Sequence, residues 1–524
     1  MFTYIPIEER RSIYGRERVI RALDLLQRVG PASDMVYTPI VVRLIVIAIK
    51  TMNGLKKDVR FDNNLLILGC GFIGQGLLPL IFRHIDINPE QISIITADER
   101  GKDVADYYKV SFYIDPVNPE NYKDILCRKL KKGDFFLNLS SDVESNILID
   151  YCCENGILYL DTCIDSWLKD SFNPEIPVSQ RSLYALREEA LMLKNKWSAS
   201  GTTAVLAHGA NPGIVSHLVK QALLNMARDE GWNIETPATR EGWARLAQSL
   251  DIKVIHIAER DSQIPASRKK PGEFINTWSI DGLVGEGLQP AELGWGSHEK
   301  YFPEDGERHR FGDQCAIYLN KPGAAVRVRT WLPLAGPQIG FLITHNEAIS
   351  LASYLSIGSG ENPEYRPTVH YAYRPCDDTV LSIQELQENN WGLQENKRPI
   401  TDEIVSGKDE LGVLLAGNKR GVYWFGSRLD IREARKLAPF NSATSLQVAA
   451  GVISGMVWAM RNPSRGIVEA EEMDFEEILS IAAPYWGKLV GEYGSWDPVE
   501  GRNSLFPEDI DASDPWQFKN LRVM

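Results

Sequence analysis

The feature that constrains this chain most is a glycine pattern that follows a short apolar run. The four residues Leu65–Leu68 are all apolar, as in a parallel strand buried on both faces. Gly69, Gly71 and Gly74 follow with the spacing G-x-G-x-x-G, and a helix-compatible run, Phe72–His84, comes next. In a dinucleotide-binding fold these glycines permit the tight turn, the approach of the backbone to a pyrophosphate, and close helix–strand packing. The helix N-terminus adds free N–H groups and a positive dipole end.

An acid at the end of a second apolar run favours NAD as the dinucleotide. This run, Ile92–Thr96, is followed by Asp98, which comes 24 residues after Gly74. An acid about 20 residues beyond the glycines holds the ribose 2′-OH in such folds, and it would repel the 2′-phosphate of NADP. Arg100 is close enough in sequence to offset part of that repulsion. A glycine-rich turn in another kind of α/β protein is the alternative interpretation.

From residue 65 onwards, strand-like and helix-like runs alternate. We expect helices at 102–108, 121–131 and 143–154, and strands at 111–114, 134–140 and 156–162. This alternation predicts an α/β fold with a Rossmann-like, doubly wound parallel sheet, whose ligands lie at the carboxyl ends of the strands. Asp142 and the range 161–165 follow such ends. The expected NAD-binding residues are Gly69, Gly71, Phe72, Ile73, Gly74, Asp98, Asn138, Ser140 and Thr162.

The next apolar run leads into Gly209-Ala-Asn-Pro-Gly213 and a predicted helix at 215–226. Asn211 then lies at a strand end, where its amide could orient a ligand. An ordinary Asn-Pro turn explains the same residues equally well.

Beyond residue 218 the pattern changes to short strands, such as 252–257 and 325–331, with longer loops, which predicts a second, mixed α+β domain. A small-residue-rich helix at 442–460 should pack closely and return to cover the first domain. We therefore expect an N-terminal extension at 1–62, an NAD-binding domain at 63–217, a substrate domain at 218–435, and C-terminal helices with an irregular tail at 436–524. In the extension, residues 17–28 have helical spacing, and packing or a subunit contact is its default role.

Composition limits the class of partner. The net charge of −13 argues against nucleic acid and is compatible with a cationic ligand, although a solvated acidic surface explains it as well. The seven cysteines include no C-x-x-C pair, which indicates neither a disulfide framework nor a zinc or other metal site and fits a reducing cytoplasm. The apolar run at 40–49, interrupted by Arg43, is too short to span a membrane.

The segment 255–299 combines carboxylates with tryptophans, which suits an organic cation. A protonated diamine would need a carboxylate at each end. A solvated charged surface with core tryptophans is the alternative, and composition alone favours it. His345 ends an apolar run, where it would meet a cleft or lie satisfied in the core. The acids and tryptophans of the segment are Glu259, Asp261, Trp278, Asp281, Glu286, Glu292, Trp295 and Glu299.

Several runs of this sequence carry a resemblance to a known family. The most distinctive is Glu286-Gly-Leu-Gln-Pro-Ala-Glu-Leu-Gly-Trp-Gly296. The others are Gly69-Cys-Gly-Phe-Ile-Gly74, Asn138-Leu-Ser140, Tyr159-Leu-Asp-Thr162, Gly209-Ala-Asn-Pro-Gly213, His256-Ile-Ala-Glu-Arg-Asp261, Asn276-Thr-Trp278, Thr344-His-Asn-Glu347, Tyr365-Arg-Pro-Thr368 and His370-Tyr-Ala-Tyr373. Through these runs the chain resembles the bacterial homospermidine synthases of the saccharopine-dehydrogenase-like group. The resemblance is collinear over residues 64–460 and leaves the N-terminal extension outside it.

This resemblance implies an NAD-dependent aminobutyl transferase. Hydride is removed from putrescine to give an imine, ammonia leaves, and a second putrescine condenses with the same carbon. The bound cofactor then returns the hydride, which gives homospermidine, so that NAD is not consumed. Spermidine can replace the first putrescine, with diaminopropane leaving. A cytoplasmic homodimer is also implied. The alternative is a saccharopine-type or carboxyspermidine-type dehydrogenase, whose carboxylate substrates need an arginine. A nucleotide-binding regulator without turnover is a third class.

The resemblance also implies roles for individual residues. Trp278 would hold an iminium or ammonium by a cation–π contact. Glu259 and Asn211 would orient one amine, and Glu286 with His345 would bind the distal ammonium or move protons. Asp142 and Asp165 would complete an acidic cleft. The family often has Glu followed by Pro-Trp at the last position, whereas this chain has Asp165-Ser-Trp167, so its carboxylate is one methylene shorter.

Overall fold

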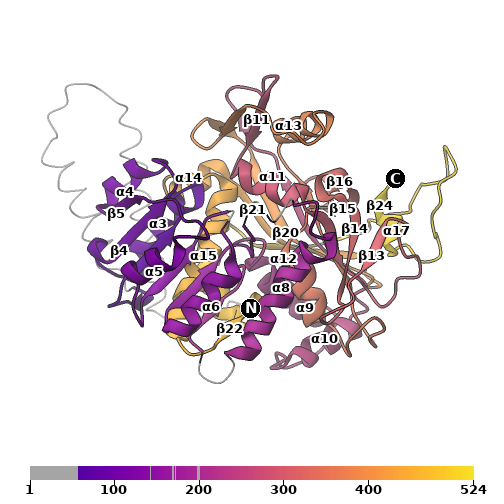
Figure 1. Ribbon diagram of the computed structural model, residues 1–524. Helices are drawn as coiled ribbons and strands as arrows, with labels where there is room; N and C mark the ends of the chain where they lie inside the picture. The colour runs from indigo at the N-terminus through magenta and orange to yellow at the C-terminus, as the bar shows by residue number, and fades with distance from the viewer. Residues whose placement is uncertain (1–56, 142, 168–169, 171–172, 198–200) are drawn as a thin grey trace, which may run out of the picture.

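The structure is a computed structural model that describes residues 57–141, 143–167, 170, 173–197 and 201–524 (Figure 1). The helical pattern at 17–28, the apolar run at 40–49 and the candidate residue Asp142 lie outside these residues. The described chain forms two large β-sheets, each covered by helices.

Within the described residues, the first sheet has seven strands, all parallel, in the order β22-β8-β7-β6-β2-β4-β5. Counted from β2, six of them have the order 3-2-1-4-5-6, which is that of dinucleotide-binding folds. The predicted Rossmann-like sheet is confirmed. The strands are β2 (Leu65–Leu68), β4 (Ile92–Thr96), β5 (Ser111–Ile114), β6 (Phe135–Asn138), β7 (Leu158–Asp161), β8 (Ala204–Val205) and β22 (Ile467–Val468).

Strand β2 is apolar at every position because helices cover both faces of this sheet. Successive side chains of a strand point to opposite faces. Leu65 and Ile67 belong to a buried cluster that includes residues of α3 (Phe72–His84) and α15 (Ala443–Arg461). Leu66 and Leu68 belong to another cluster, which includes residues of α5 (Tyr122–Lys129), α6 (Ser145–Asn155) and α8 (Leu183–Lys196).

The second sheet is mixed, as predicted for the second domain. In the part of the chain that the structure describes it has eleven strands, and β9 lies near its centre, parallel to β17 and antiparallel to β20. The strands are β9 (Val254–Asp261), β12 (Pro290–Gly294), β13 (Gly306–Arg308), β14 (Ala316–Pro322), β15 (Arg327–Leu332), β16 (Gly336–Phe341), β17 (Thr368–Arg374), β20 (Lys408–Ala416), β21 (Val422–Asp430), β23 (Val490–Gly494) and β24 (Arg522–Val523).

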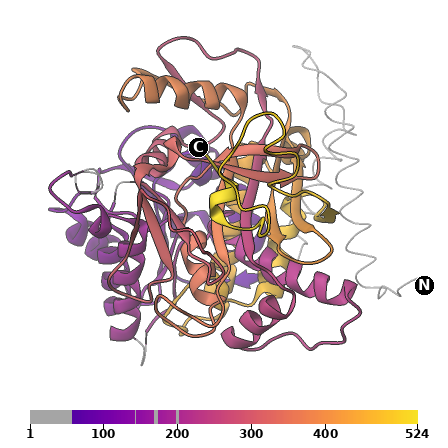
Figure 2. The ribbon, with the colours of Figure 1, turned by 90° about the vertical axis from the view of Figure 1, so that its right-hand side faces the viewer.

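Helices of the second half surround this sheet. The parallel pair β11 (Glu273–Asn276) and β18 (Asn396–Pro399) is separate from this sheet and packs against α13. Figure 1 labels β11 and α13 at one end of the molecule, and Figure 2 shows the orange helix α13 at the same end in the turned view. The helices are α9 (Ile214–Asp229), α10 (Arg240–Ser249), α11 (Ile280–Leu288), α12 (Asn346–Tyr354), α13 (Asp377–Glu388), α14 (Ile431–Leu437), α16 (Phe475–Ala482) and α17 (Phe518–Leu521).

The C-terminal part of the chain contributes to the first sheet. Helix α15 packs on α3 and on β7, and β22 pairs with β8. Helix α15 is rich in small residues because it approaches the loop after β8: a Cβ added at Gly451 would lie 2.0 Å from the carbonyl oxygen of Gly209. This crossing joins the predicted domains at 63–217 and 436–524, whose boundaries stay a prediction.

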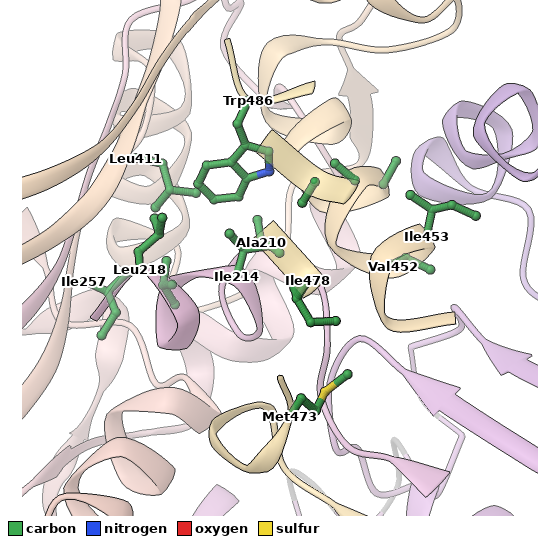
Figure 3. Packing of buried hydrophobic residues seen from close by; sticks show 14 of the residues in the cluster. Ala210, Ile214, Leu218, Ile257, Leu411, Val452, Ile453, Met473, Ile478 and Trp486 are labelled. Carbon is green, nitrogen blue, oxygen red and sulfur yellow. The ribbon is translucent and has the colours of Figure 1, made fainter. Parts of the chain in front are cut away.

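A single buried core connects the two sheets. Figure 3 shows Ile214 and Leu218 of α9 in the same region as Ile257 of β9, Leu411 of β20 and Val452 of α15. Among the described helices, α15 is the one that is long and apolar enough to cross a membrane, and 89% of its most apolar window is buried inside the protein. Its composition is therefore that of a core helix.

Candidate active site

The glycine loop has the geometry that its spacing predicts. Gly69 has a φ of +92°, and a Cβ there would lie 2.9 Å from the carbonyl oxygen of Leu139. At Gly74 an added Cβ would lie 3.0 Å from the carbonyl oxygen of Gly69, so this glycine permits close packing of α3 on the turn. At Gly71 an added Cβ would meet no atom within 4 Å. The loop is therefore tight on its protein side and open at Gly71.

The first turn of α3 offers N–H groups to an anion. Gly71 is its N-cap, and within the described residues no side chain caps it. Phe72 and Ile73 begin the helix and are half-buried, and the first turn carries no acid. Unpaired N–H groups and the positive end of the helix dipole suit a pyrophosphate. The residues present therefore fit a dinucleotide cofactor.

Asp98 follows β4 and is engaged by Arg100. Its carboxylate accepts the backbone N–H of Arg100 at 2.9 Å and the side-chain Nε–H at 2.8 Å. The side chain of Asp98 is 43% exposed, so the pair lies at the surface beside the strand end. The guanidinium fixes the carboxylate in place and also balances its charge.

The other strand ends meet at a hydrogen-bonded network. Buried Asn138, at the end of β6, accepts the hydroxyl of Ser140 at 2.6 Å and donates to Tyr159 at 3.4 Å. Tyr159 donates to Asp161 at 2.9 Å, and the other oxygen of Asp161 accepts the N–H of Ala207 at 2.6 Å. Burial raises the pKa of Asp161 to about 7. This network connects the strand ends where the cofactor is expected to the loop that carries Asn211. Half-buried Thr162 comes directly after Asp161 in the chain.

Asn211, in the loop after β8 of the first sheet, meets Glu259, which lies on β9 of the second sheet. The Nδ2 of Asn211 donates to the carboxylate of Glu259 at 3.0 Å, and the hydroxyl of Tyr371 donates to the same carboxylate oxygen. Glu259 is 2% exposed, and burial raises its pKa to about 7 despite these two donors. A carboxyl with such a pKa can gain or lose a proton near neutral pH.

His345 lies between two carboxylates. Its Nε2 is 3.1 Å from Glu286 on α11, and its Nδ1 is 3.3 Å from Glu347 in the first turn of α12. Burial lowers the pKa of His345, but the charges of Glu347 and Glu286 outweigh it and raise that pKa to about 10. His345 is therefore a cation at neutral pH, and it lies between two acidic side chains.

Aromatic rings contact both acidic groups. The indole Nε1–H of half-buried Trp278 donates to the hydroxyl of Tyr373 at 3.2 Å. The rings of Tyr371 and Tyr373 are stacked with centroids 5.3 Å apart, and the ring of His345 lies 4.3 Å from that of Tyr371. Tyr371 thus links the two acidic groups, because its hydroxyl donates to Glu259 and its ring packs against His345, the partner of Glu286.

Asp165 completes this region from the side of the first sheet. Its carboxylate accepts the thiol of Cys163 at 3.0 Å, and its backbone exchanges hydrogen bonds with Ser145. A pocket brings it together with residues of the second domain. The described lining residues include no lysine or arginine; they are Cys163, Ile164, Asp165, Leu183, Pro212, Glu286, Gln289, Thr344, His345 and Asn346.

Comparisons with known proteins match this arrangement over most of the chain. Residues 65–205 match the family described as "Saccharopine dehydrogenase NADP binding domain", and residues 209–495 match "Saccharopine dehydrogenase C-terminal domain". The chain is 46% identical to a homospermidine synthase of Blastochloris viridis over 473 residues, which are 88% of this chain and 98% of that protein. The chain belongs to the homospermidine synthase family.

Two further homospermidine synthases agree. That of Mesorhizobium japonicum is 45% identical over 470 residues, which cover 87% of this chain and 96% of that one. The crystal structure of the Legionella pneumophila homospermidine synthase in complex with NAD is 50% identical, with a TM-score of 0.82, and the match covers 89% of this chain and 98% of that one.

In this homospermidine synthase homologue, some acids and tryptophans of the segment 255–299 belong to the candidate site, and others have structural contacts. Glu259, Trp278 and Glu286 lie in the region just described, whereas Asp281 pairs with Lys397 at the surface. The other members have structural partners: buried Glu292 accepts backbone N–H groups at the start of α8, Trp295 packs against Phe302 and Phe518, and Glu299 accepts from Thr368 and the N–H of Phe518. Composition could not separate these two groups.

Four residues of the region received no role in the sequence analysis. Tyr371 and Tyr373 alternate on β17, which puts both rings on one face, and Glu347 follows His345 by two residues. The fourth is Asp409 of β20, which pairs in register with Asp261. Burial, together with the charges of nearby Glu259 and Asp261, raises the pKa of Asp409 well above its ordinary value. The i, i+2 spacing could have indicated the tyrosines, but no local signal indicates Asp409.

Proposed function

We propose that this chain is an NAD-dependent homospermidine synthase that joins two putrescine molecules into homospermidine with release of ammonia. Spermidine serves as an alternative aminobutyl donor, with diaminopropane leaving. The proposal combines family membership with a pocket whose described lining carries the carboxylates of Asp165 and Glu286 and no cationic side chain other than His345. Aromatic rings lie next to this pocket, because Tyr371 packs against His345.

The cofactor is NAD, held by the glycine loop and the N–H groups of α3. Asp98 would receive the ribose hydroxyls, and Asn138, Ser140 and Thr162 would border the cofactor at the strand ends. When bound, NAD accepts a hydride from the amine-bearing carbon and gives it back to the product. The chain's own contribution is to bind the pyrophosphate and to place the amine beside the strand ends.

Glu259 and Asn211 orient the amine whose carbon reacts. The carboxylate of Glu259 is buried and fixed by two donors, so it can receive an ammonium group without rearranging. Its raised pKa, about 7, also allows it to take a proton from the amine and to return one. The same group thus binds the amine and moves a proton at its nitrogen.

Glu286, His345 and Glu347 receive the distal ammonium. Two acidic side chains surround the one imidazolium of His345, so the group has an acidic side chain in excess. A lone buried carboxylate pair would carry a larger desolvation cost, and His345 reduces it by neutralising half of that charge. Asp165 lines the same pocket and adds a carboxylate from the loop after β7. Asp142 is proposed to add another.

Trp278 holds the cationic intermediate. Its indole is fixed by the hydrogen bond to Tyr373, so the ring face is oriented before substrate binds. An aromatic face attracts an ammonium or iminium with an energy of about 1–2 kcal/mol when the contact is partly desolvated. The attraction adds no negative charge, so it leaves the protonation of Glu259 and Glu286 unchanged.

One observation separates this reaction from that of a saccharopine-type or carboxyspermidine-type dehydrogenase. A substrate with a carboxylate needs an arginine or lysine as a partner, and the described lining of the pocket contains neither. The pocket instead fits a ligand with ammonium groups at both ends.

The test is incubation of the enzyme with putrescine and a catalytic amount of NAD. Our proposal predicts homospermidine in large excess over the NAD added, with no accumulation of NADH. A net dehydrogenase would accumulate NADH in proportion to product, and a nucleotide-binding regulator would form no product. Either of those outcomes contradicts the proposal.

We further propose that the enzyme is a homodimer of the cytoplasm. None of the seven cysteines is in a disulfide among the described residues, and only Cys127 is exposed. This is the pattern of a protein that folds under reducing conditions. Light scattering coupled to size-exclusion chromatography measures the assembly directly, and a monomeric mass at working concentration contradicts the dimer.

A further inference from the structure

Four aromatic rings, two of them exposed and two half-buried, gather at α4 (Lys102–Tyr108), a helix at the outer edge of the first domain in Figure 1. We call this group the α3–α4 aromatic patch; it consists of Phe82, Tyr107, Tyr108 and Phe440. Phe82 stacks on Tyr108 with centroids 5.4 Å apart, and Tyr107 lies 5.0 Å from Tyr108 and 6.3 Å from Phe440. The four rings are thus one contiguous surface rather than scattered side chains.

Two aromatic side chains of the patch are more exposed to solvent than is favourable for apolar rings. Tyr107 is 73% exposed and Phe440 is 37% exposed. Single exposed apolar residues need no explanation, but contiguous aromatic rings at a surface indicate a contact with something that covers them. The patch lies apart from the pocket of Glu286 and His345, and the proposed reaction does not use it.

The described chain begins beside this patch. The ammonium of Lys57 donates to the carbonyl oxygen of Phe82, a member of the patch. Directly after it, β1 (Val59–Arg60) pairs with β3 (Ile85–Asp86) at the end of α3. Because an extended chain spans about 3.3 Å per residue, only a few residues before Lys57 are needed to reach the four rings.

Residues 1–56 have the composition that such a surface requires. They contain nine Lys and Arg against five Asp and Glu, whereas the remaining 468 residues contain 48 against 65. Their apolar residues recur at helical spacing, for example Ile20, Leu23 and Ala22 with Leu26. On α4, Asp106 comes directly before Tyr107 and pairs with Lys102 at 3.8 Å. A segment with apolar positions at helical spacing can pack on the aromatic rings.

We propose that residues 1–56 of the same chain dock on the α3–α4 aromatic patch. The family matches begin only at residue 65, so this contact is an addition to the shared fold. A second copy of the chain is the weaker candidate, because a stable dimer interface buries about 1,200–2,000 Å² and four partly buried rings offer far less. A tethered segment needs much less affinity, since its effective concentration is about millimolar.

Photo-cross-linking of the full chain tests the docking. The change Tyr107→p-benzoylphenylalanine places a cross-linker in the patch, and Tyr301→p-benzoylphenylalanine is the control on a side chain that is 41% exposed elsewhere. After irradiation we expect a monomer-sized product in which mass spectrometry joins position 107 to a peptide of residues 1–56. We expect about tenfold less cross-linking to that segment from position 301. Cross-links from 107 only to other regions, or only covalent dimers, overturn the proposal.

A second measurement does not depend on the cross-linker. In the full chain, the double change Tyr107→Ser and Phe440→Ser removes the exposed rings and leaves the glycine loop untouched. We expect amide hydrogen exchange in peptides of residues 1–56 to become several-fold faster, while exchange in β2 and β4 stays unchanged. Unchanged exchange in residues 1–56 would mean that the patch does not hold the segment. Neither readout uses enzymatic activity, so both stand apart from the proposed reaction.

Discussion

Replacing Glu286 by glutamine should change both the protonation of His345 and the affinity for diamine. Glu286 lies 3.1 Å from Nε2 of His345, and Glu347 lies 3.3 Å from Nδ1. Glutamine preserves the size and hydrogen-bonding capacity of the side chain but removes its charge. His345 then keeps one carboxylate partner instead of two.

The expected size of the change follows from the geometry. Burial lowers the pKa of His345, yet the two carboxylates raise it to about 10. One opposite charge at this distance shifts a pKa by about 1–3 units, so the pKa of His345 should fall to about 7–9 in Glu286→Gln. Each unit corresponds to about 1.4 kcal/mol, which gives about 1.4–4 kcal/mol of lost stabilisation of the imidazolium.

The sign of the pH dependence follows from the same pKa. The ordinary pKa of histidine is about 6.5, so that of His345 is raised in the folded protein. Its contribution to the free energy of unfolding is fully present below pH about 6.5 and is lost as the pH rises through about 10. In Glu286→Gln the loss should be complete near pH 7–9, about 1–3 units earlier. Thermal unfolding across this range and NMR titration of labelled histidine measure it.

Kinetics provides the second readout. The loss of one carboxylate from a buried charge pair should lower kcat/KM for putrescine. The fall should correspond to a loss of about 2–5 kcal/mol of transition-state stabilisation. NAD affinity should not change, because Glu286 is on α11 and outside the glycine loop. The matched control is Asp281→Asn on the same helix, whose surface pair with Lys397 should matter by less than about 1 kcal/mol. Wild-type titration of His345 and wild-type kcat/KM in Glu286→Gln would refute this account of the distal site.

Three further outcomes follow from the structure. Trp278→Ala should lose about tenfold or more in kcat/KM, whereas Trp278→Phe keeps part of the activity, because the cation–π contact contributes about 1–2 kcal/mol; a folded, fully active Trp278→Ala removes the indole from the site. Gly451→Ala, whose Cβ would lie 2.0 Å from the oxygen of Gly209, should lower the free energy of unfolding in urea by about 1–3 kcal/mol, whereas Gly285→Ala, with no atom within 4 Å, should not. In isothermal titration calorimetry NAD should bind much more tightly than NADP, and Asp98→Asn should reduce the difference between the two affinities. Equal affinities of the wild-type protein for NAD and NADP would exclude Asp98 as the residue that discriminates against the 2′-phosphate.

The local features of the first domain were predictable because neighbouring residues determine them. The turn at Gly69 needs a positive φ. The adjoining strand β2 and helix α3 have the predicted bounds. The later strands were predicted too long: residues 134–140 form a strand only over Phe135–Asn138. There the chain leaves the sheet early, because Asn138 turns back to bond the N–H and hydroxyl of Ser140.

The partnerships within the site depend on pairings between distant strands. Asn211 meets Glu259 across 48 residues, and Tyr373 is opposite Glu259 only because β17 and β9 are parallel in that register. Asp409 comes from β20, about 150 residues after Glu259 in the chain, so periodicity could not place it here. The resemblance named Glu259 and Asn211, but the sequence contains no pattern that assigns their contact.

The central claim is that the hydride taken from putrescine returns to the same carbon within one enzyme. The most direct measurement uses putrescine deuterated at both carbons that bear nitrogen, with a catalytic amount of NAD and an excess of unlabelled NADH in solution. Mass spectrometry of the product then reports where the hydride went. The account predicts homospermidine that keeps all of the deuterium of both putrescine molecules. Homospermidine that lacks one deuterium per molecule would show exchange with the free cofactor, and an absence of homospermidine would contradict the proposed reaction itself.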